Sequence, residues 1–273
     1  MKIIDGHAHA CGMFLHTNEV LSYMKENHIY KIILTAGEPN SKKIYKLPYL
    51  AKVFHDSKLI YITNILTAIL IRFSKLNKHI DQGNEKVALM AQNFPDYIMN
   101  TYWINPLEAD CIQKIESFRK KYSFCMIKMH QCWTKFDMKD ERIIKVIEWA
   151  ELHRKPIFIH LKSKIQVKKF ISLTKKYPSV NFILAHLIGV EEFDRTVGEN
   201  VYFDISCPSL HSVKMLKKAW DNFGAERILL GSDAPYGTHN INLAISQMRE
   251  IGMNDEEIEL VCSKNIQKLL GIN

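Results

Sequence analysis

Two histidines near the start of the chain, His7 and His9, stand two residues apart. On an extended strand, alternate residues project to the same side, so both imidazoles face one way and Ala8 faces the other. Two neutral imidazoles placed like this form half of a binding site for zinc or manganese. The pair alone is weak evidence, because the chain has 12 histidines and chance pairs are common.

Three further residues with metal-binding side chains follow short apolar runs. His160 ends the run 155–159, His186 ends the run 181–185, and Asp233 follows a third run. A lone histidine after a strand is more often structural, but two in matching positions after a His-x-His pair favour a shared site. Asp233 is either a turn residue or helix cap, or a metal ligand that also accepts a proton from activated water. The set therefore predicts a hydrolytic metal centre.

Strands and helices that alternate along the chain are expected to position these residues. The spacing between the later polar residues approximates one strand plus one helix, the repeat of a parallel barrel. The carboxyl ends of all strands in such a barrel meet at one rim, so distant residues can converge there. We expect an α/β fold, a (β/α)8 barrel, with strands at 2–5, 31–36, 98–104, 124–129, 157–159, 181–185, 201–205 and 227–231.

Helical periodicity fills the intervals between these strands. The segment 141–153 places apolar residues on one face, with Asp140 as its N-cap. Between the second and third strands the connection is about twice the usual length, with helical patterns at 42–55, 59–76 and 84–93. We expect an enlarged helical connection at about 37–97, which forms a lid, a subunit contact or an extra helix packed on the barrel wall.

Length and composition limit the class of protein. A chain of 273 residues that is 47% hydrophobic suits one barrel domain over residues 1–273. Its net charge of +8 favours anionic partners, and without a nucleic-acid-binding motif we expect a small anionic substrate and no nucleic acid. The six cysteines lack paired spacing, and no signal peptide or membrane span is visible. We expect a cytoplasmic protein without membrane contact, with a homodimer left open.

The polar residues and their local contexts resemble a known group. His7-x-His9, His160, Ile183-Leu184-Ala185-His186 and Leu230-Gly231-Ser232-Asp233-Ala234-Pro235 are similar to the small, amidohydrolase-related (amidohydrolase 2) branch of the amidohydrolase superfamily. The resemblance implies a (β/α)8 barrel in which His7, His9, His160 and Asp233 bind one divalent metal, zinc or manganese. It also implies that His186 acts on substrate or water. Only six residues precede His7 and 40 follow Asp233, so we expect no accessory β-sandwich.

Lys128 and His130, two apart on the expected fourth strand, should both point into the barrel. In binuclear relatives a carboxylated lysine on this strand bridges two metals, whereas in mononuclear relatives of the small branch the lysine is an unmodified cation. The Lys-x-His pattern resembles the mononuclear branch more closely. We therefore expect Lys128 and His130 to bind substrate, with a second metal only if Lys128 is carboxylated.

These features predict a metal-dependent hydrolase of an amide- or lactone-type C–N or C–O bond in a small carboxylated metabolite. Asp233 and His186 would be its catalytic residues. The alternative is a metal-dependent decarboxylase of an aromatic or unsaturated acid that uses the same residues. A metal-dependent nuclease is a remoter option, since related barrels usually carry a glutamate where this chain has Lys128. For Asp204 and Ser206 we expect structural hydrogen bonds.

Overall fold

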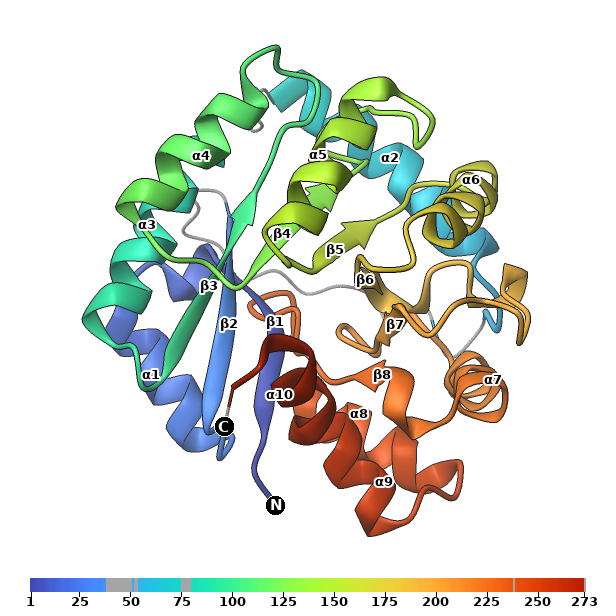
Figure 1. Cartoon of the computed structure of the whole chain (residues 1–273). Coiled ribbons are helices and arrows are strands. Elements are labelled where there is room, and N and C mark those ends of the chain that lie inside the picture. Colours follow the sequence, from blue (N-terminus) through green and yellow to red (C-terminus); the bar gives the residue numbers. More distant parts are fainter. Residues whose placement is uncertain (38–50, 52–53, 75–79, 238, 273) are drawn as a thin grey trace.

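Eight parallel strands form one sheet in which neighbours follow the order of the chain (Figure 1). The computed structural model describes residues 1–37, 51, 54–74, 80–237 and 239–272. The order β1 to β8 with helices between the strands confirms the predicted barrel. The strands are β1 (Ile4–Ala10), β2 (Lys31–Ala36), β3 (Ile98–Trp103), β4 (Met126–His130), β5 (Ile157–His160), β6 (Phe182–Leu184), β7 (Val201–Asp204) and β8 (Ile228–Leu229).

Backbone hydrogen bonds bring the segment around β8 against β1. The Gly6 N–H donates to the Leu230 carbonyl (3.0 Å), and the His9 N–H donates to the Ala234 carbonyl (2.7 Å). Pairing with β2, in which Ala10 lies opposite Ala36, extends β1 to Ala10, so the expected end of the first strand at residue 5 was wrong. His7 and His9 therefore lie within a paired strand, which fixes the direction of both side chains more tightly than a loop would.

Helices surround the strands, and their apolar sides pack on the outward-facing strand residues. The predicted N-cap of α5 is confirmed, because the Asp140 side chain accepts a hydrogen bond from the Arg142 N–H (2.9 Å). The helices are α1 (Thr17–Glu26), α2 (Lys58–Ser74), α3 (Ile80–Asn93), α4 (Cys111–Lys121), α5 (Glu141–Leu152), α6 (Lys164–Lys176), α7 (Val213–Phe223), α8 (Asn240–Glu250), α9 (Asp255–Glu259) and α10 (Asn265–Leu270). Single-turn helices include Gly12–Phe14, Ala185–Leu187, Val190–Glu192 and Ala225–Arg227, with a π-turn at Leu260–Lys264.

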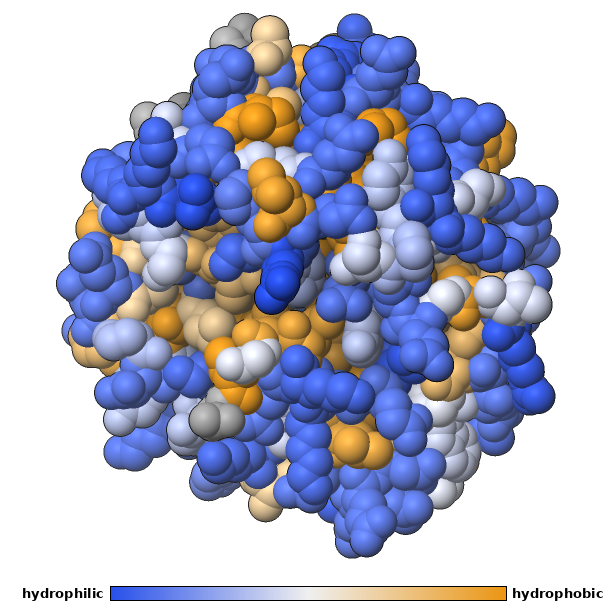
Figure 2. Space-filling view, in the orientation of Figure 1, coloured by the Kyte–Doolittle hydropathy of each residue, from blue (hydrophilic) through white to orange (hydrophobic). Residues whose placement is uncertain are grey.

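Apolar side chains fill the end of the barrel at which the strands begin. Ile4, Ile33, Met126 and Leu229 belong to this cluster, and Ile266 of α10 packs against them. Figure 1 shows α10 in front of the strands, and Figure 2 shows this face to be largely hydrophilic with smaller hydrophobic areas. The polar residues singled out above lie at the opposite end, where the strands finish.

The connection between β2 and β3 contains α2 and α3. Asn64 of α2 donates to the Leu161 carbonyl just after β5 (3.2 Å), and Ser57 donates to Glu191 after β6 (2.9 Å). Helix α2 therefore covers the carboxyl ends of β5 and β6, behind the strands in Figure 1. The expected helix at 42–55 lies almost entirely outside the described residues. Within the described segments, no helix has the length and apolarity needed to cross a bilayer.

Candidate functional site

Four side chains from distant parts of the chain meet at the carboxyl end of the barrel. His7, His186 and Asp233 each offer a ligand atom, and these atoms lie within 4.8 Å of one another. The Nε2 atoms of His7 and His9 are both 3.4 Å from the same atom, Asp233 Oδ1. All four residues are buried. We call His7, His9, His186 and Asp233 the inner group.

Hydrogen bonds aim the two β1 imidazoles at Asp233. His9 Nδ1 lies 3.0 Å from the Ala36 carbonyl, and since a carbonyl only accepts, Nδ1 carries the proton and Nε2 keeps its lone pair. His7 Nδ1 lies 3.4 Å from the Thr35 hydroxyl. Burial, and next the charge of Lys128, lower the pKa of His7 well below its ordinary value, so this imidazole is neutral.

Asp233 supplies the negative charge of the inner group. Burial alone would raise its pKa, but the nearby His186 holds that pKa well below its ordinary value. Lone pairs of neutral imidazoles that face an ionised carboxylate repel it unless a cation lies between them. Two nitrogen donors and one carboxylate oxygen in this arrangement fit a divalent metal ion such as zinc or manganese.

Asp204 and Ser206, on and just after β7, orient His186. The His186 N–H donates to Asp204 Oδ2 (3.0 Å), and His186 Nδ1 donates to the Ser206 carbonyl (3.0 Å). The Ser206 hydroxyl in turn donates to Asp204 Oδ2 (2.5 Å). Both residues thus make the hydrogen bonds expected of them, and they leave His186 Nε2 free to act within the inner group.

The backbone is strained at two members of the inner group. His186 has φ 53° and Asp233 has φ 55°, a left-handed conformation that side chains with a Cβ rarely adopt. Such strain persists only where the surrounding structure holds it in place, and it is concentrated at functional sites. Neither value could be read from the sequence, because no glycine occupies either position.

Lys128 lies beside the inner group rather than at the rim. It is fully buried, with Nζ 3.1 Å from His7 Nε2 and 4.0 Å from the centre of the Phe158 ring. Burial lowers the pKa of Lys128 to about 7, although Asp233 and Asp204 oppose this effect. Phe158 was not among the residues predicted from the sequence, although it stands two residues before His160 on the same strand face, which was a usable signal.

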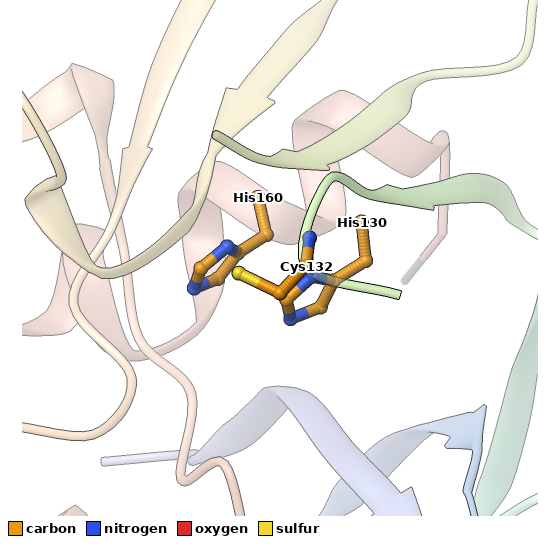
Figure 3. Close-up of side chains that lie close together, drawn as sticks. All are labelled: His130, Cys132 and His160. Carbon is orange, nitrogen blue, oxygen red and sulfur yellow. Dashed lines mark hydrogen bonds between the residues drawn. The ribbon is translucent and has the colours of Figure 1, made fainter. Parts of the chain in front are cut away.

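His130, Cys132 and His160 form a second cluster, which we call the outer group (Figure 3). Their potential ligand atoms also lie within 4.8 Å of one another. The rings of His130 and His160 stack with centroids 3.9 Å apart and planes at 12°. The Cys132 N–H donates to His130 Nδ1 (3.1 Å), so Nε2 of this ring carries the proton, and burial raises the pKa of Cys132 to about 12.

This geometry does not suit a metal. Parallel stacked rings send their in-plane lone pairs in parallel directions, and the lone pair of His130 is already taken by the backbone. Its Nε2–H can instead donate to an anion. His130 is half-buried, at the mouth of the barrel, which agrees with a contact to substrate.

His160 stands between the two groups. The structure stacks it on His130, while its ring centre lies 5.3 Å from that of His186. Its Nδ1 is buried and has no hydrogen-bond partner among the described residues. Trp103, at the end of β3, was also not predicted as a site residue. Its ring stacks on His130 at 5.8 Å, and its buried N–H likewise has no hydrogen-bond partner within the described part of the chain.

Comparison with protein families gives one match. The family described as amidohydrolase matches residues 77–272. No curated protein sequence matches the chain significantly. The matched region includes β3 to β8, and with them His160, His186 and Asp233.

Solved structures with the same architecture cover nearly the whole chain at low sequence identity. A probable 2-pyrone-4,6-dicarboxylic acid hydrolase from Acinetobacter baumannii, with citric acid bound, has a TM-score of 0.65 and 12% identity over 100% of both chains. A 4-oxalomesaconate hydratase from Rhodopseudomonas palustris has a TM-score of 0.65 and 14% identity over 98% of this chain and 95% of its own. A variant of 5-carboxyvanillate decarboxylase from Novosphingobium aromaticivorans, with bound manganese, has a TM-score of 0.71 and 11% identity over 99% and 97%.

Proposed function

Since the chain belongs to the amidohydrolase family, we propose that it is a metal-dependent hydrolase of an amide- or lactone-type C–N or C–O bond in a small carboxylated molecule. The observation that carries this proposal is the convergence of His7 Nε2 and His9 Nε2 on one oxygen of an ionised Asp233. A divalent ion bound there, zinc or manganese, would polarise a carbonyl oxygen and make water a stronger acid.

His7, His9, His160 and Asp233 would hold this ion. The first two and Asp233 already direct their donor atoms at one point. His160 contributes a buried ring nitrogen without a hydrogen-bond partner among the described residues, which is consistent with a metal ligand. Binding at His7 Nε2 would replace the present contact of that atom with Lys128 Nζ.

Asp233 would take the proton of the attacking water and pass it to the leaving group. Its low pKa keeps it ionised, which is the state a general base requires. His186, whose Nδ1 donates to the Ser206 carbonyl, would accept a hydrogen bond from the attacking water at Nε2 and orient it. Asp204 Oδ2, 3.5 Å from His186 Nδ1, would help to hold the ring in this orientation.

Lys128 and His130 would bind the substrate carboxylate. The Lys128 ammonium and the His130 Nε2–H are donors on two sides of the inner group. The contact of Lys128 Nζ with the face of Phe158 favours an unmodified cation over a carboxylated, anionic lysine. We therefore propose one metal rather than two.

Decarboxylation of an aromatic acid is the second candidate. Flat rings surround the inner group: Phe158 stacks on His7 at 4.2 Å, and Trp103 lies 5.9 Å from His9. Such walls suit an aromatic substrate. The same residues would then manage the proton delivered to the carbon that loses carbon dioxide.

The two reactions separate in one experiment. Protein loaded with zinc or manganese is assayed for carbon dioxide release from aromatic acids and for hydrolysis of lactones and amides, beside Asp233→Asn and His186→Asn. We expect hydrolysis that Asp233→Asn abolishes and that His186→Asn slows by about 10²–10⁴-fold. If the protein instead releases carbon dioxide, and both substitutions suppress that release, the reaction is decarboxylation rather than hydrolysis. If neither substitution affects turnover, the assignment of the active site is wrong.

A further inference from the structure

A cavity of about 870 Å³ lies outside the barrel, between α2 and the loops that follow β3, β4 and β5. We call it the outer chamber. It is bordered by Cys132, whose sulfur lies within 4.8 Å of ring nitrogens of His130 and His160, so it adjoins the site already described. Its volume lies at the upper end of the roughly 300–1,000 Å³ typical of ligand pockets, more than a single small ring needs.

One wall of the chamber is apolar. Helix α2 contributes Ile65, Ala68 and Ile69, three and four residues apart and so on one face of the helix, and Trp133 contributes an indole ring. Ile65 is 54% exposed and Ile69 is 47% exposed. A ligand with an apolar body would remove this surface from water, which is favourable.

The chamber is also strongly cationic. Arg72, Lys135 and Lys162 line it, and among the described residues none of the three forms an ion pair. No acidic residue occurs among the described lining residues. An anionic group placed among these cations would be attracted to them, with no carboxylate in the described lining to compete for them.

We propose that the outer chamber binds the far end of an elongated organic dianion. Its apolar body would lie against Ile65, Ile69 and Trp133, and its distal carboxylate would bind Lys135 and Lys162. The near carboxylated end would reach the inner group, and only this part rests on the proposed function. The chain would accordingly select substrates longer than one aromatic ring, with charge at both ends.

The test compares ligands of one shape that differ in one charge. Terephthalate, biphenyl-4,4′-dicarboxylate and terphenyl-4,4″-dicarboxylate are each paired with their monoamide, and Kd is measured by calorimetry on the manganese-loaded protein. We expect at least one diacid to bind about tenfold more tightly than its monoamide. In the Lys135→Met/Lys162→Met variant this ratio should fall below about twofold.

Two further variants make the result specific. Lys139→Met/Lys145→Met removes two exposed lysines outside the chamber and should keep the tenfold ratio. Ile65→Ser/Ile69→Ser should weaken diacid and monoamide equally, because the wall contacts the shared apolar body. The proposal is overturned if no diacid in the series exceeds its monoamide, or if the ratio survives in Lys135→Met/Lys162→Met.

Failure here is distinguishable from failure of the proposed function. The affinity ratio is an equilibrium measurement that requires no turnover. If the ratio is absent while the metal-dependent reaction is found, only the chamber proposal fails. If the ratio is present while no lactone, amide or acid reacts, only the proposed reaction fails.

Discussion

The inner and outer groups both combine histidines with another potential metal ligand at similar spacing, yet only one is arranged as a metal site. Both place three potential ligand atoms within 4.8 Å of one another. In the inner group, imidazole lone pairs converge on a carboxylate. In the outer group, two parallel rings stack and the third member is a thiol whose pKa is raised to about 12.

The difference comes from the partners of each imidazole. The Ala36 carbonyl takes the Nδ1 proton of His9 and so directs its Nε2 lone pair into the site. The Cys132 N–H instead occupies the Nδ1 lone pair of His130 and leaves that ring with only an N–H to offer. Proximity of ligand types is thus insufficient, because the tautomer that each hydrogen bond selects decides whether a nitrogen can ligate.

Removal of an inner-group imidazole should have the largest effect. For His9→Asn we expect metal content to fall and kcat/KM to drop by about 10³-fold or more, since activation of water depends on the ion. Elemental analysis and the assay above measure both quantities, with His239→Asn, an exposed histidine, as the control. A His9→Asn protein with full metal content would show that the inner group does not coordinate.

Substitutions of His160 and His186 should distinguish a metal ligand from a residue that acts on water. His160→Asn should lose metal, whereas His186→Asn should keep it and lower kcat by about 10²–10⁴-fold, as loss of a group that acts on protons does. Metal content and kcat are measured on the same preparations. The reverse outcome, with metal lost only in His186→Asn, would exchange the roles of these two residues.

Loss of the Asp204 carboxylate, which helps to orient His186, should have a smaller effect on kcat. Asp204→Asn removes a charge that lies 3.5 Å from His186 Nδ1, so we expect kcat to fall by about 10–100-fold at unchanged metal content. The pH profile of kcat should shift as well, because burial raises the pKa of the Asp204 carboxyl group and the variant lacks this titrating group. A profile identical to that of the wild type would mean that Asp204 acts only structurally.

Lys128 should reduce stability at neutral pH. Its pKa is about 7 in the folded protein, against an ordinary value of 10.5, so the unfolded chain binds more protons between these values and wild-type stability rises with pH across that window. Lys128→Met should therefore raise the free energy of unfolding by about 4 kcal/mol at pH 7, with the gain vanishing near pH 10.5. Chemical denaturation of metal-free protein measures it, with Lys145→Met as control. A gain that does not depend on pH would contradict the lowered pKa.

The outer group should tolerate loss of its thiol. Cys132→Ser replaces a protonated side chain by one of similar size, so metal content should be unchanged and kcat should stay within about threefold of the wild type. Elemental analysis of the purified variant checks this directly. A loss of metal comparable to that in His9→Asn would make the outer group a metal site.

The fold followed from the sequence because its signals are local. Apolar runs such as 31–36 and the N-cap Asp140 depend on neighbouring residues, and the structure places β2 and α5 where these patterns predict. The end of β1 was misjudged because pairing with β2, as far as Ala10 with Ala36, extends the strand beyond residue 5. That pairing is a tertiary effect which no short stretch of sequence contains.

For the site, the sequence could name candidate residues but could not give their geometry. His7, His9, His186 and Asp233 converge as the strand spacing suggested. The stacking of His160 on His130 could not be read in advance, since it depends on the relative orientation of β4 and β5. The outer chamber depends on where α2 crosses the rim, which the helical pattern of that segment does not specify.

Anomalous diffraction from a crystal grown with manganese tests the central claim most directly. We predict one strong peak at roughly 2.0–2.3 Å from His7 Nε2, His9 Nε2 and an Asp233 oxygen, and none between His130 and Cys132. A peak held by His130 and Cys132, or none near Asp233 in fully loaded protein, would contradict the account.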